Sequence, residues 1–301
     1  MVRIFAGRAL APFFMGDEMN RIHKFLLDLA EQNAKVYEAM PEVQAIIIGG
    51  SVSRGKPTLY SDIDTIIICQ QLPHPDRLAE ACRTNGGLHH ETVNQDEDGL
   101  LEHYYLHNIE CQFAWSKVEE YDRRLKQVLD DESLDPINHM IMSGTMDARV
   151  VYGQEYVASL RQRLAQFPRG LQVKMVEKFI GVLPVEEIRL RLLREESLIW
   201  FYSVLTATQR GILGSLFGLN RLYHPGGFRK IDYHIAKMQI APSDLYPRLN
   251  NMFSVPPADA LAALADIYRE TIDLIGKHLP EADIAEARKS IVMKLIPMNL
   301  P

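Results

Sequence analysis

The first half of the chain alternates helical and strand-like patterns of hydrophobic and polar residues. Apolar side chains recur at helical spacing between residues 18 and 39, and Pro41 predicts where this helix ends. Two runs of β-branched residues follow, at 43–48 and 62–69, and each predicts a buried strand. Helices and strands in alternation are typical of an α/β domain.

A short helix is expected after Pro75, and a hairpin is expected further on. The segments 100–106 and 109–115 are strand-like, and only His107 and Asn108 separate them. A connection of two residues suits a tight hairpin, because Asn tolerates positive φ. These two segments are therefore expected to pair as neighbouring antiparallel strands.

After Trp115 the pattern becomes helical. Helices are expected at about 117–130, 154–166, 171–180, 185–217, 228–239 and 256–278. The break between Val150 and Gly153 marks the expected boundary, which gives a first domain of residues 1–152 and a second of residues 153–301. We therefore predict a small α/β domain followed by an all-helical C-terminal domain.

Composition narrows the class of protein. The chain has 301 residues, of which 47% are hydrophobic and 24% charged, the usual mixture of a globular protein. Its 33 Lys and Arg residues against 39 Asp and Glu residues give a net charge of −6, which argues against general nucleic-acid binding. Three widely spaced cysteines without a CxxC pair indicate a reducing compartment and neither a disulfide framework nor a cysteine-rich zinc site.

Two segments have some features of targeting or membrane-spanning sequences. The first fifteen residues carry Arg3 and Arg8 before a short apolar run, but Pro12 interrupts that run and acidic residues follow at once. The segment 198–219 is long and apolar, yet it contains Arg210 and several other polar residues, so a buried helix accounts for it better. We expect a cytoplasmic protein.

The segment after the first predicted strand can hold a phosphate. Gly49 and Gly50 end that strand and let the backbone turn sharply beneath a ligand. Ser51 then begins a predicted helical turn, whose free N–H groups favour an anion. Asp62 and Asp64 follow on the next strand, where side chains two residues apart point to the same face.

Two carboxylates this close repel each other unless a cation lies between them. Oxygen ligands beside a phosphate-binding turn suit Mg²⁺, which binds a few carboxylates together with substrate phosphates. A purely structural alternative is that Asp62 caps a turn and Asp64 lies exposed on an edge strand. The strongly apolar run around both residues favours the metal site.

These residues resemble a known signature. The string Gly50-Ser51-Val52-Ser53-Arg54-Gly55, followed by Ser61-Asp62-Ile63-Asp64 and an apolar strand, is similar to that of the DNA polymerase β nucleotidyltransferase superfamily. It looks most like the small-molecule branch of aminoglycoside and lincosamide nucleotidyltransferases. Template-independent RNA polymerases of the superfamily usually carry an Arg-Asp pair shortly after the glycines, whereas Gly55 follows Arg54 here.

The resemblance implies a fold and a reaction. The fold would be a minimal nucleotidyltransferase domain with a mixed β-sheet and flanking helices. The cofactor would be Mg²⁺, with Mn²⁺ as an alternative, and the co-substrate ATP or another nucleoside triphosphate. The partner would be a hydroxyl-bearing small molecule, which receives the nucleoside monophosphate as pyrophosphate is released. Gly50, Ser51, Arg54 and Ser61 would bind the nucleotide, although Arg54 could instead brace the loop through an ion pair, and Lys56 is expected to face solvent.

The family's third acidic residue normally lies on a later apolar strand, and Glu110 fits that position. With Asp62 and Asp64 it would complete the catalytic and metal-binding set, and it would deprotonate the acceptor hydroxyl. Glu102 and Glu91 are weaker candidates for this position. Alternatively, Glu110 could face solvent on a half-exposed strand and have no catalytic role.

Other polar clusters give weaker evidence of a functional site. The sequence His89-His90-Glu91 is expected in a loop rather than at a metal, and alternating His103, Tyr105 and His107 are expected on an exposed strand face. In the helical half, the unusual stretch 220–230 offers three cations for the triphosphate. They are Arg221, Arg229 and Lys230, and the sequence does not choose among them or exclude a structural turn.

Two other functions remain open. The acceptor could be a protein side chain or an RNA end, although related modifiers of proteins are typically short, single-domain chains. Alternatively, the chain could be a catalytically silent nucleotide-binding module. The presence of all three acids, Asp62, Asp64 and Glu110, argues against loss of activity.

Overall fold

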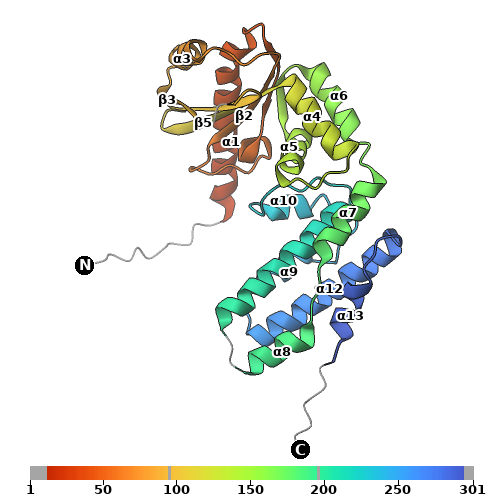
Figure 1. Cartoon of the computed structure of the whole chain (residues 1–301). Helices are drawn as coiled ribbons and strands as arrows, with labels where there is room; N and C mark the ends of the chain where they lie inside the picture. The colour runs from red at the N-terminus through yellow and green to blue at the C-terminus, as the bar shows by residue number, and fades with distance from the viewer. Residues whose placement is uncertain (1–11, 94–95, 195–196, 295–301) are drawn as a thin grey trace, which may run out of the picture. The chain divides into compact units, whose positions relative to one another are not determined.

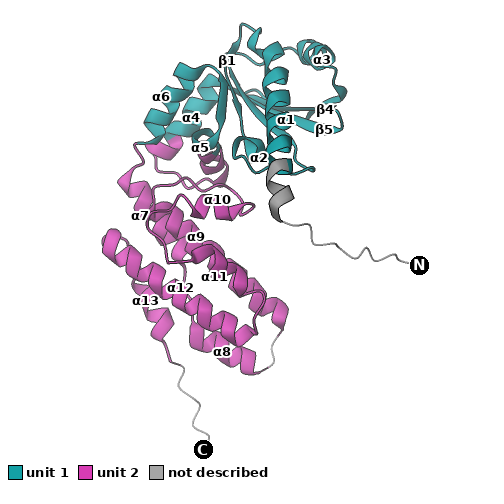
Figure 2. Cartoon of the chain, turned by 180° about the vertical axis from the view of Figure 1, so that it is seen from behind, with its two compact units in different colours: residues 1–126, 144–165 teal, residues 127–143, 166–301 magenta. Residues whose placement is uncertain are grey.

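The structure is a computed structural model that describes residues 12–93, 96–194 and 197–294. The chain divides into two compact units, coloured separately in Figure 2. The first unit contains residues 1–126 and 144–165, and the second contains residues 127–143 and 166–301. Each unit is therefore built from two separate stretches of the chain.

The first unit is built on a mixed six-stranded sheet with the strand order β3-β4-β5-β2-β1-β6. The strands are β1 (Val43–Ile48), β2 (Ile63–Cys69), β3 (Leu88–Val93), β4 (Gly99–Leu106), β5 (Ile109–Lys117) and β6 (Arg149–Tyr152). Only the β2–β5 pairing is parallel among the described strands. The predicted α/β class with flanking helices and a helical C-terminal region is confirmed.

Helices α1 (Pro12–Glu38) and α3 (Pro75–Thr84) cover one face of this sheet. Figure 1 shows α1 lying across the strands. Leu26, Ala30 and Ala34 recur along α1 at helical spacing and pack in one core with sheet residues such as Ile46 and Phe113. Burial on this side leaves the alternate side chains of β2, β4 and β5 on the other face of the sheet.

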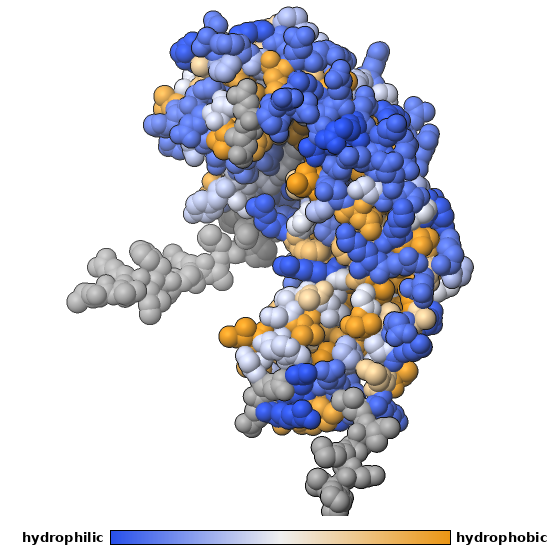
Figure 3. Space-filling view, in the orientation of Figure 1, coloured by the Kyte–Doolittle hydropathy of each residue, from blue (hydrophilic) through white to orange (hydrophobic). Residues whose placement is uncertain are grey.

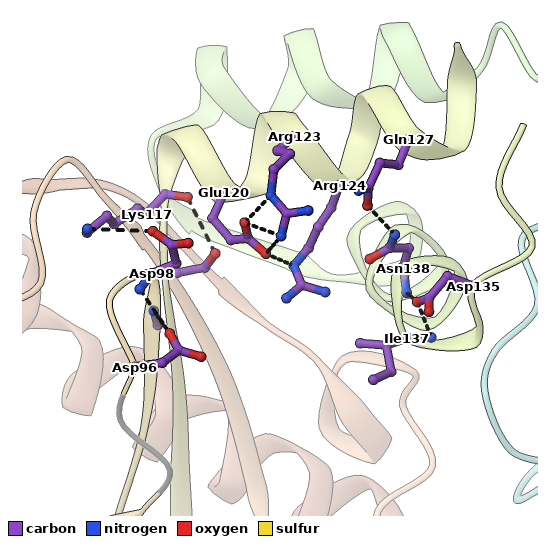
Figure 4. Close-up of polar contacts among 12 residues, drawn as sticks. Asp96, Asp98, Lys117, Glu120, Arg123, Arg124, Gln127, Asp135, Ile137 and Asn138 are labelled. Carbon is purple, nitrogen blue, oxygen red and sulfur yellow. Dashed lines mark hydrogen bonds and ion pairs between the residues drawn. The ribbon is translucent and has the colours of Figure 1, made fainter. Parts of the chain in front are cut away.

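Four further helices belong wholly or partly to this unit. They are α2 (Gly50–Ser53), α4 (Val118–Leu129), α5 (Pro136–Asp147) and α6 (Gln154–Leu164). In α4, which directly follows β5, the buried carboxylate of Glu120 accepts hydrogen bonds of 2.7 Å from Arg123 and pairs with Arg124 Nε at 2.5 Å (Figure 4). A buried carboxylate needs such partners to offset its lost hydration.

The second unit is helical. Its remaining helices are α7 (Arg169–Ile180), α8 (Val185–Leu193), α9 (Leu198–Leu219), α10 (Ile231–Ile235), α11 (Leu245–Asn251), α12 (Pro257–His278) and α13 (Ala285–Val292). Gly214 and Gly218 of α9 face Phe179 and Met175 of α7, so the two helices pack closely. No described helix is long and apolar enough to cross a membrane, α9 included.

Apolar side chains also reach the surface of the second unit, as the orange areas over its helices show in Figure 3. Leu193, at the end of α8, and Leu198 and Ile199, at the start of α9, are among the exposed ones.

Several expectations about local structure were wrong. Residues 89–91 lie in strand β3 rather than in a loop, and the helix expected at 185–217 is divided into α8 and α9. Ser197 caps α9, its side chain accepting a hydrogen bond from the Ile199 N–H at 3.2 Å. The helix expected at 228–239 is reduced to α10, and β6, α5, α11 and α13 were not expected.

Candidate nucleotidyl-transfer site

The turn that follows β1 lies directly against β2. Gly49 donates its N–H to the backbone oxygen of Asp64 at 2.8 Å. Gly50 has a φ of +62°, and a Cβ at this position would lie on the Asp64 carboxylate. Only glycine combines this backbone conformation with so close an approach. The two glycines of the motif therefore bring the strand end into contact with the second aspartate.

The loop between α2 and β2 is tied to the same turn through Ser61. Its Oγ accepts hydrogen bonds from Ser51 Oγ at 3.0 Å and from the Thr58 N–H at 2.9 Å. Lys56 donates its backbone N–H to the Ser51 oxygen at 3.0 Å. Arg54 caps the end of α2, with its N–H on the Val52 oxygen. The predicted nucleotide-binding residues thus belong to one loop whose ends are hydrogen-bonded together.

The three acids lie at the same end of two adjoining strands. In the parallel β2–β5 register, Asp64 is opposite Gln112 and Ile63 is opposite Cys111. Asp62 directly precedes β2 and Glu110 is the second residue of β5, so continuing the register by one step would bring them level with each other. Paired residues on neighbouring strands share a face, and alternate residues of one strand share a face. Asp62, Asp64 and Glu110 are therefore expected on one side of the sheet.

Burial explains which side this is. Ile63 and Cys111 are fully buried under α1, while Asp64, Glu110 and Gln112 are only partly buried. A strand that places its apolar residues toward the core must turn the alternate residues away from it. The apolar residues that flank the acids therefore fix the direction in which the acids point.

Glu110 has a neighbour that the sequence did not point to. His103 of β4 places Nδ1 3.3 Å from Glu110 Oε1 and Nε2 3.3 Å from Glu91 Oε2. His103 lies opposite Gln112 on one side and opposite Glu91 on the other. Only the pairing of β3, β4 and β5 reveals this arrangement, because the three residues are separated in sequence. The expected alternation of His103 and Tyr105 along an exposed face agrees with their partial exposure, whereas His107 lies in the hairpin turn.

Glu102, the first rival for the third acidic position, lies on the opposite face of the sheet. Its side chain is fully buried and accepts hydrogen bonds from Trp115 Nε1 at 3.1 Å and Tyr37 OH at 3.2 Å. His90 Nε2 lies 3.0 Å from Glu102 Oε1, the oxygen that also accepts the hydrogen bond from Tyr37. Burial raises the pKa of Glu102 to about 7 and lowers the pKa of His90. Glu102 is therefore a residue of the core rather than of the site.

The donor set fits a metal that is shared with a substrate. Within residues 12–93, 96–194 and 197–294, no three His, Cys, Asp or Glu side chains form a ready-made metal group. Mg²⁺ is commonly held by one or two carboxylates together with substrate phosphates, rather than by a protein cage. Asp62 and Asp64 beside the Gly50 turn satisfy that requirement, and the metal role of Glu110 stays a prediction.

The three cations expected to help lie in the second unit, in the segment between α9 and α10. Arg221 has a φ of 56° just after the end of α9, and Lys230, with a φ of 57°, caps the start of α10. Arg229 precedes it in the same segment. Their contact with phosphate stays a prediction.

Comparison with known proteins gives a distant match. No family model matches this chain, and no relative was found among the curated proteins. A solved structure of a nucleotidyltransferase-like protein from Exiguobacterium sibiricum matches over 86% of each chain, with 16% sequence identity and a TM-score of 0.35. The case for a function therefore rests on the side chains of the site.

Proposed function

We propose that this chain transfers a nucleoside monophosphate, AMP in the first instance, from a nucleoside triphosphate to a hydroxyl of a small molecule and releases pyrophosphate. The observation that carries the proposal is the close approach of the Gly50 turn to Asp64, at the strand ends that also bear Asp62 and Glu110. A glycine turn that admits a charged chain next to clustered carboxylates is the arrangement that metal-assisted transfer at phosphorus needs.

Each residue has a part in this reaction. The loop tied together by Ser51 and Ser61 would hold the triphosphate. Asp62 and Asp64 would hold Mg²⁺, which when bound supplies the positive charge that offsets the phosphate oxygens. Glu110 would accept the proton of the acceptor hydroxyl.

The bonds balance as follows. The acceptor oxygen forms a bond to the α-phosphorus, and the bond from that phosphorus to the oxygen bridging to the β-phosphate breaks. Pyrophosphate leaves with the electron pair of that bond, and the hydroxyl proton passes to Glu110. Most of the rate gain would come from holding the two reactants in line and from neutralising charge.

A direct test incubates the chain with Mg²⁺, each of the common nucleoside triphosphates and a panel of hydroxyl compounds that includes aminoglycosides, lincosamides and simple glycosides. Mass spectrometry would detect the nucleotidyl adduct, and a coupled assay would detect pyrophosphate. Asp64→Asn should abolish both, because it removes a charge at nearly constant volume. Asp76→Asn, at the exposed start of α3, is the matched control. Undiminished transfer by Asp64→Asn contradicts the proposal.

A further inference from the structure

A pocket of about 620 Å³ lies beside the strand end that carries Glu110. Six residues matter for what it could bind: Asn85, Leu88, His89, Tyr105, His107 and Asn108. Its volume is within the range of small-molecule sites. The nucleotide-binding loop around Gly50 and Ser51 does not contribute to it.

Three turns of the backbone create this pocket. Helix α3 ends at Asn85, followed by Gly86 with a φ of 74°. The β3–β4 pairing is irregular between Leu88 and Glu91, and His89 within this bulge has a φ of 56°. A bulge re-aims a side chain, and here it brings the His89 ring 6.3 Å from that of Tyr105. The third turn is the β4–β5 hairpin connection.

Tyr105 joins the pocket to the candidate site. It is paired with Glu110 in the antiparallel β4–β5 register. Directly opposed residues of such a pair point to the same face, with Cβ atoms about 5 Å apart. Glu110 is not itself a lining residue, so a molecule seated against Tyr105 would reach the Glu110 carboxylate across this cross-strand pair.

The lining offers rings, amides and two apolar side chains, Leu88 and Leu106. The Tyr105 ring is held edge-to-face between His89 and His103, with centroid distances of 6.3 Å and interplanar angles of 78° and 67°. Leu88 is 65% exposed, so its apolar side chain is accessible to a ligand. Asn108 carries an amide, which can both donate and accept hydrogen bonds. The amide nitrogen of Asn85 already donates to the Asn33 oxygen at 3.1 Å and to Tyr104 OH at 3.0 Å, which leaves its Oδ1 as an acceptor.

Charge is missing from this lining. None of the described lining residues is Asp, Glu, Lys or Arg. Two carboxylates on the same face of the sheet, Glu91 and Glu110, both lie 3.3 Å from His103. A polyamine placed here would lose hydration without gaining its own ion pair. A neutral ligand would lose much less.

We propose that this pocket binds the acceptor, and that the acceptor is a neutral, polyhydroxylated ring compound of the glycoside class. The inference rests on the proposed function for the identity of the reacting hydroxyl, which would be directed at Glu110. The apolar face of a sugar ring would lie on Tyr105 and Leu88. Its hydroxyls would exchange hydrogen bonds with the Asn108 amide and the imidazoles, and would donate to Asn85 Oδ1.

Binding can be measured apart from transfer. The probes are methyl glycosides of the common hexoses and pentoses, with glucosamine as the amine-bearing arm, observed on the full chain by saturation-transfer NMR. Leu88→Glu places a carboxylate in the pocket at an exposed edge-strand position. Asn108→Gly removes the amide and keeps the hairpin turn, since glycine accepts its φ of 63°. Leu101→Glu, at an exposed β4 position outside the pocket, is the matched control.

We expect a neutral glycoside to bind, and its Kd to rise at least about tenfold in Leu88→Glu and in Asn108→Gly, while Leu101→Glu leaves it unchanged. The Kd of Mg²⁺–nucleotide should be the same in all four proteins. Binding of no glycoside, or equal binding by Leu88→Glu and the unaltered chain, overturns the inference.

Two other results also overturn it. If Leu88→Glu and Asn108→Gly also raise the Kd of Mg²⁺–nucleotide, the pocket binds the nucleoside rather than the acceptor. If glucosamine binds more tightly than the neutral sugars and Leu88→Glu strengthens it further, the acceptor is cationic. A chain that binds a glycoside in the pocket but transfers nothing would keep the pocket assignment and remove the proposed function.

Discussion

The carboxylate of Glu102 accepts a hydrogen bond from the indole Nε1 of Trp115 at 3.1 Å, inside the core of the first unit. Tyr37 donates to its other oxygen at 3.2 Å, and His90 lies 3.0 Å from that oxygen. These partners do not fully offset the burial, which raises the pKa of Glu102 from its ordinary 4.5 to about 7. Folding therefore favours the protonated carboxyl.

This pKa predicts how stability depends on pH. Between about pH 4.5 and 7 the folded chain binds more protons at Glu102 than the unfolded chain, so the free energy of unfolding falls as the pH rises through this window. Glu102→Gln removes the titration. The free energy of unfolding of this variant minus that of the unaltered chain should rise by about 2 kcal/mol from pH 5 to pH 8. Urea unfolding at the two pH values measures this gain.

His90 contributes in the opposite direction. Its lowered pKa means that the folded chain binds fewer protons at His90 than the unfolded chain, so this contribution raises the free energy of unfolding as the pH rises. Comparing the variant with the unaltered chain at each pH cancels most of that contribution. A pH-independent difference for Glu102→Gln would show that the carboxyl is ionised in the folded core.

The contact between Gly50 and Asp64 predicts a specific loss of nucleotide binding. Gly50→Ala forces a Cβ onto the Asp64 carboxylate and also strains a backbone with φ of +62°. Gly86→Ala carries a similar strain at φ of +74°, but its Cβ would meet nothing within 4 Å. Both should lose about 1 kcal/mol of unfolding free energy from the backbone. Only Gly50→Ala should also lose Mg²⁺–nucleotide binding in a fluorescence titration, and equal behaviour of the two variants would count against the site.

Glu110 should matter for chemistry rather than for nucleotide binding. Glu110→Gln keeps the size of the side chain and removes its capacity to accept a proton. The transfer rate in single-turnover experiments should fall about 10²- to 10⁴-fold, the usual contribution of a general base, with an unchanged Kd for Mg²⁺–nucleotide. Glu91→Gln, the other carboxylate beside His103, should transfer at close to the original rate. If Glu110→Gln binds nucleotide poorly yet reacts normally once saturated, the residue holds the metal and is not the base.

The hydrogen bonds that Ser61 accepts are expected to order the phosphate-binding loop. Ser61→Ala removes the acceptor for both Ser51 Oγ and the Thr58 N–H. Each hydrogen bond is worth about 1 kcal/mol, so nucleotide Kd should rise about tenfold while kcat changes little. Ser53→Ala loses a comparable bond, 3.0 Å long, to the Asp147 oxygen but leaves this loop tied. Calorimetric titration of both variants separates loop order from general stability; equal Kd values would assign Ser61 no part in binding.

Strongly apolar strands could be predicted from the sequence, and the weak edge strand could not. β1, β2, β4 and β5 each carry an apolar run that must be buried, and the turn at His107 and Asn108, with φ of 51° and 63°, matches the expected hairpin. β3 pairs only with β4, so nearly all its side chains are exposed and no alternation marks it. Ser197, a residue type that favours helix N-caps, marks the start of α9. The apolar run after it favoured one continuous helix over 185–217, so the division between α8 and α9 was not predicted.

The residues of the candidate site could likewise be predicted only where a local sequence pattern marks them. Gly50, Asp62 and Asp64 could be selected from their spacing along the chain, although Asp62 directly precedes β2 rather than lying in it. Placing Glu110 level with Asp62 required the parallel β2–β5 register, in which neither strand follows the other directly. The approach of His103 to Glu110 depends on side-chain positions across two strands, which no local pattern encodes.

The interleaving of the two units has a consequence for how this protein could be divided or recombined. The chain crosses from one unit to the other three times, after residues 126, 143 and 165. A truncation after residue 126 would strip away β6, the edge strand that pairs with β1 just before the Gly50 turn. A truncation after residue 165 would instead carry along a segment whose packing partners are lost. No single cut yields both pieces intact, so the halves are not exchangeable modules, and any chimaera has to be joined at three junctions.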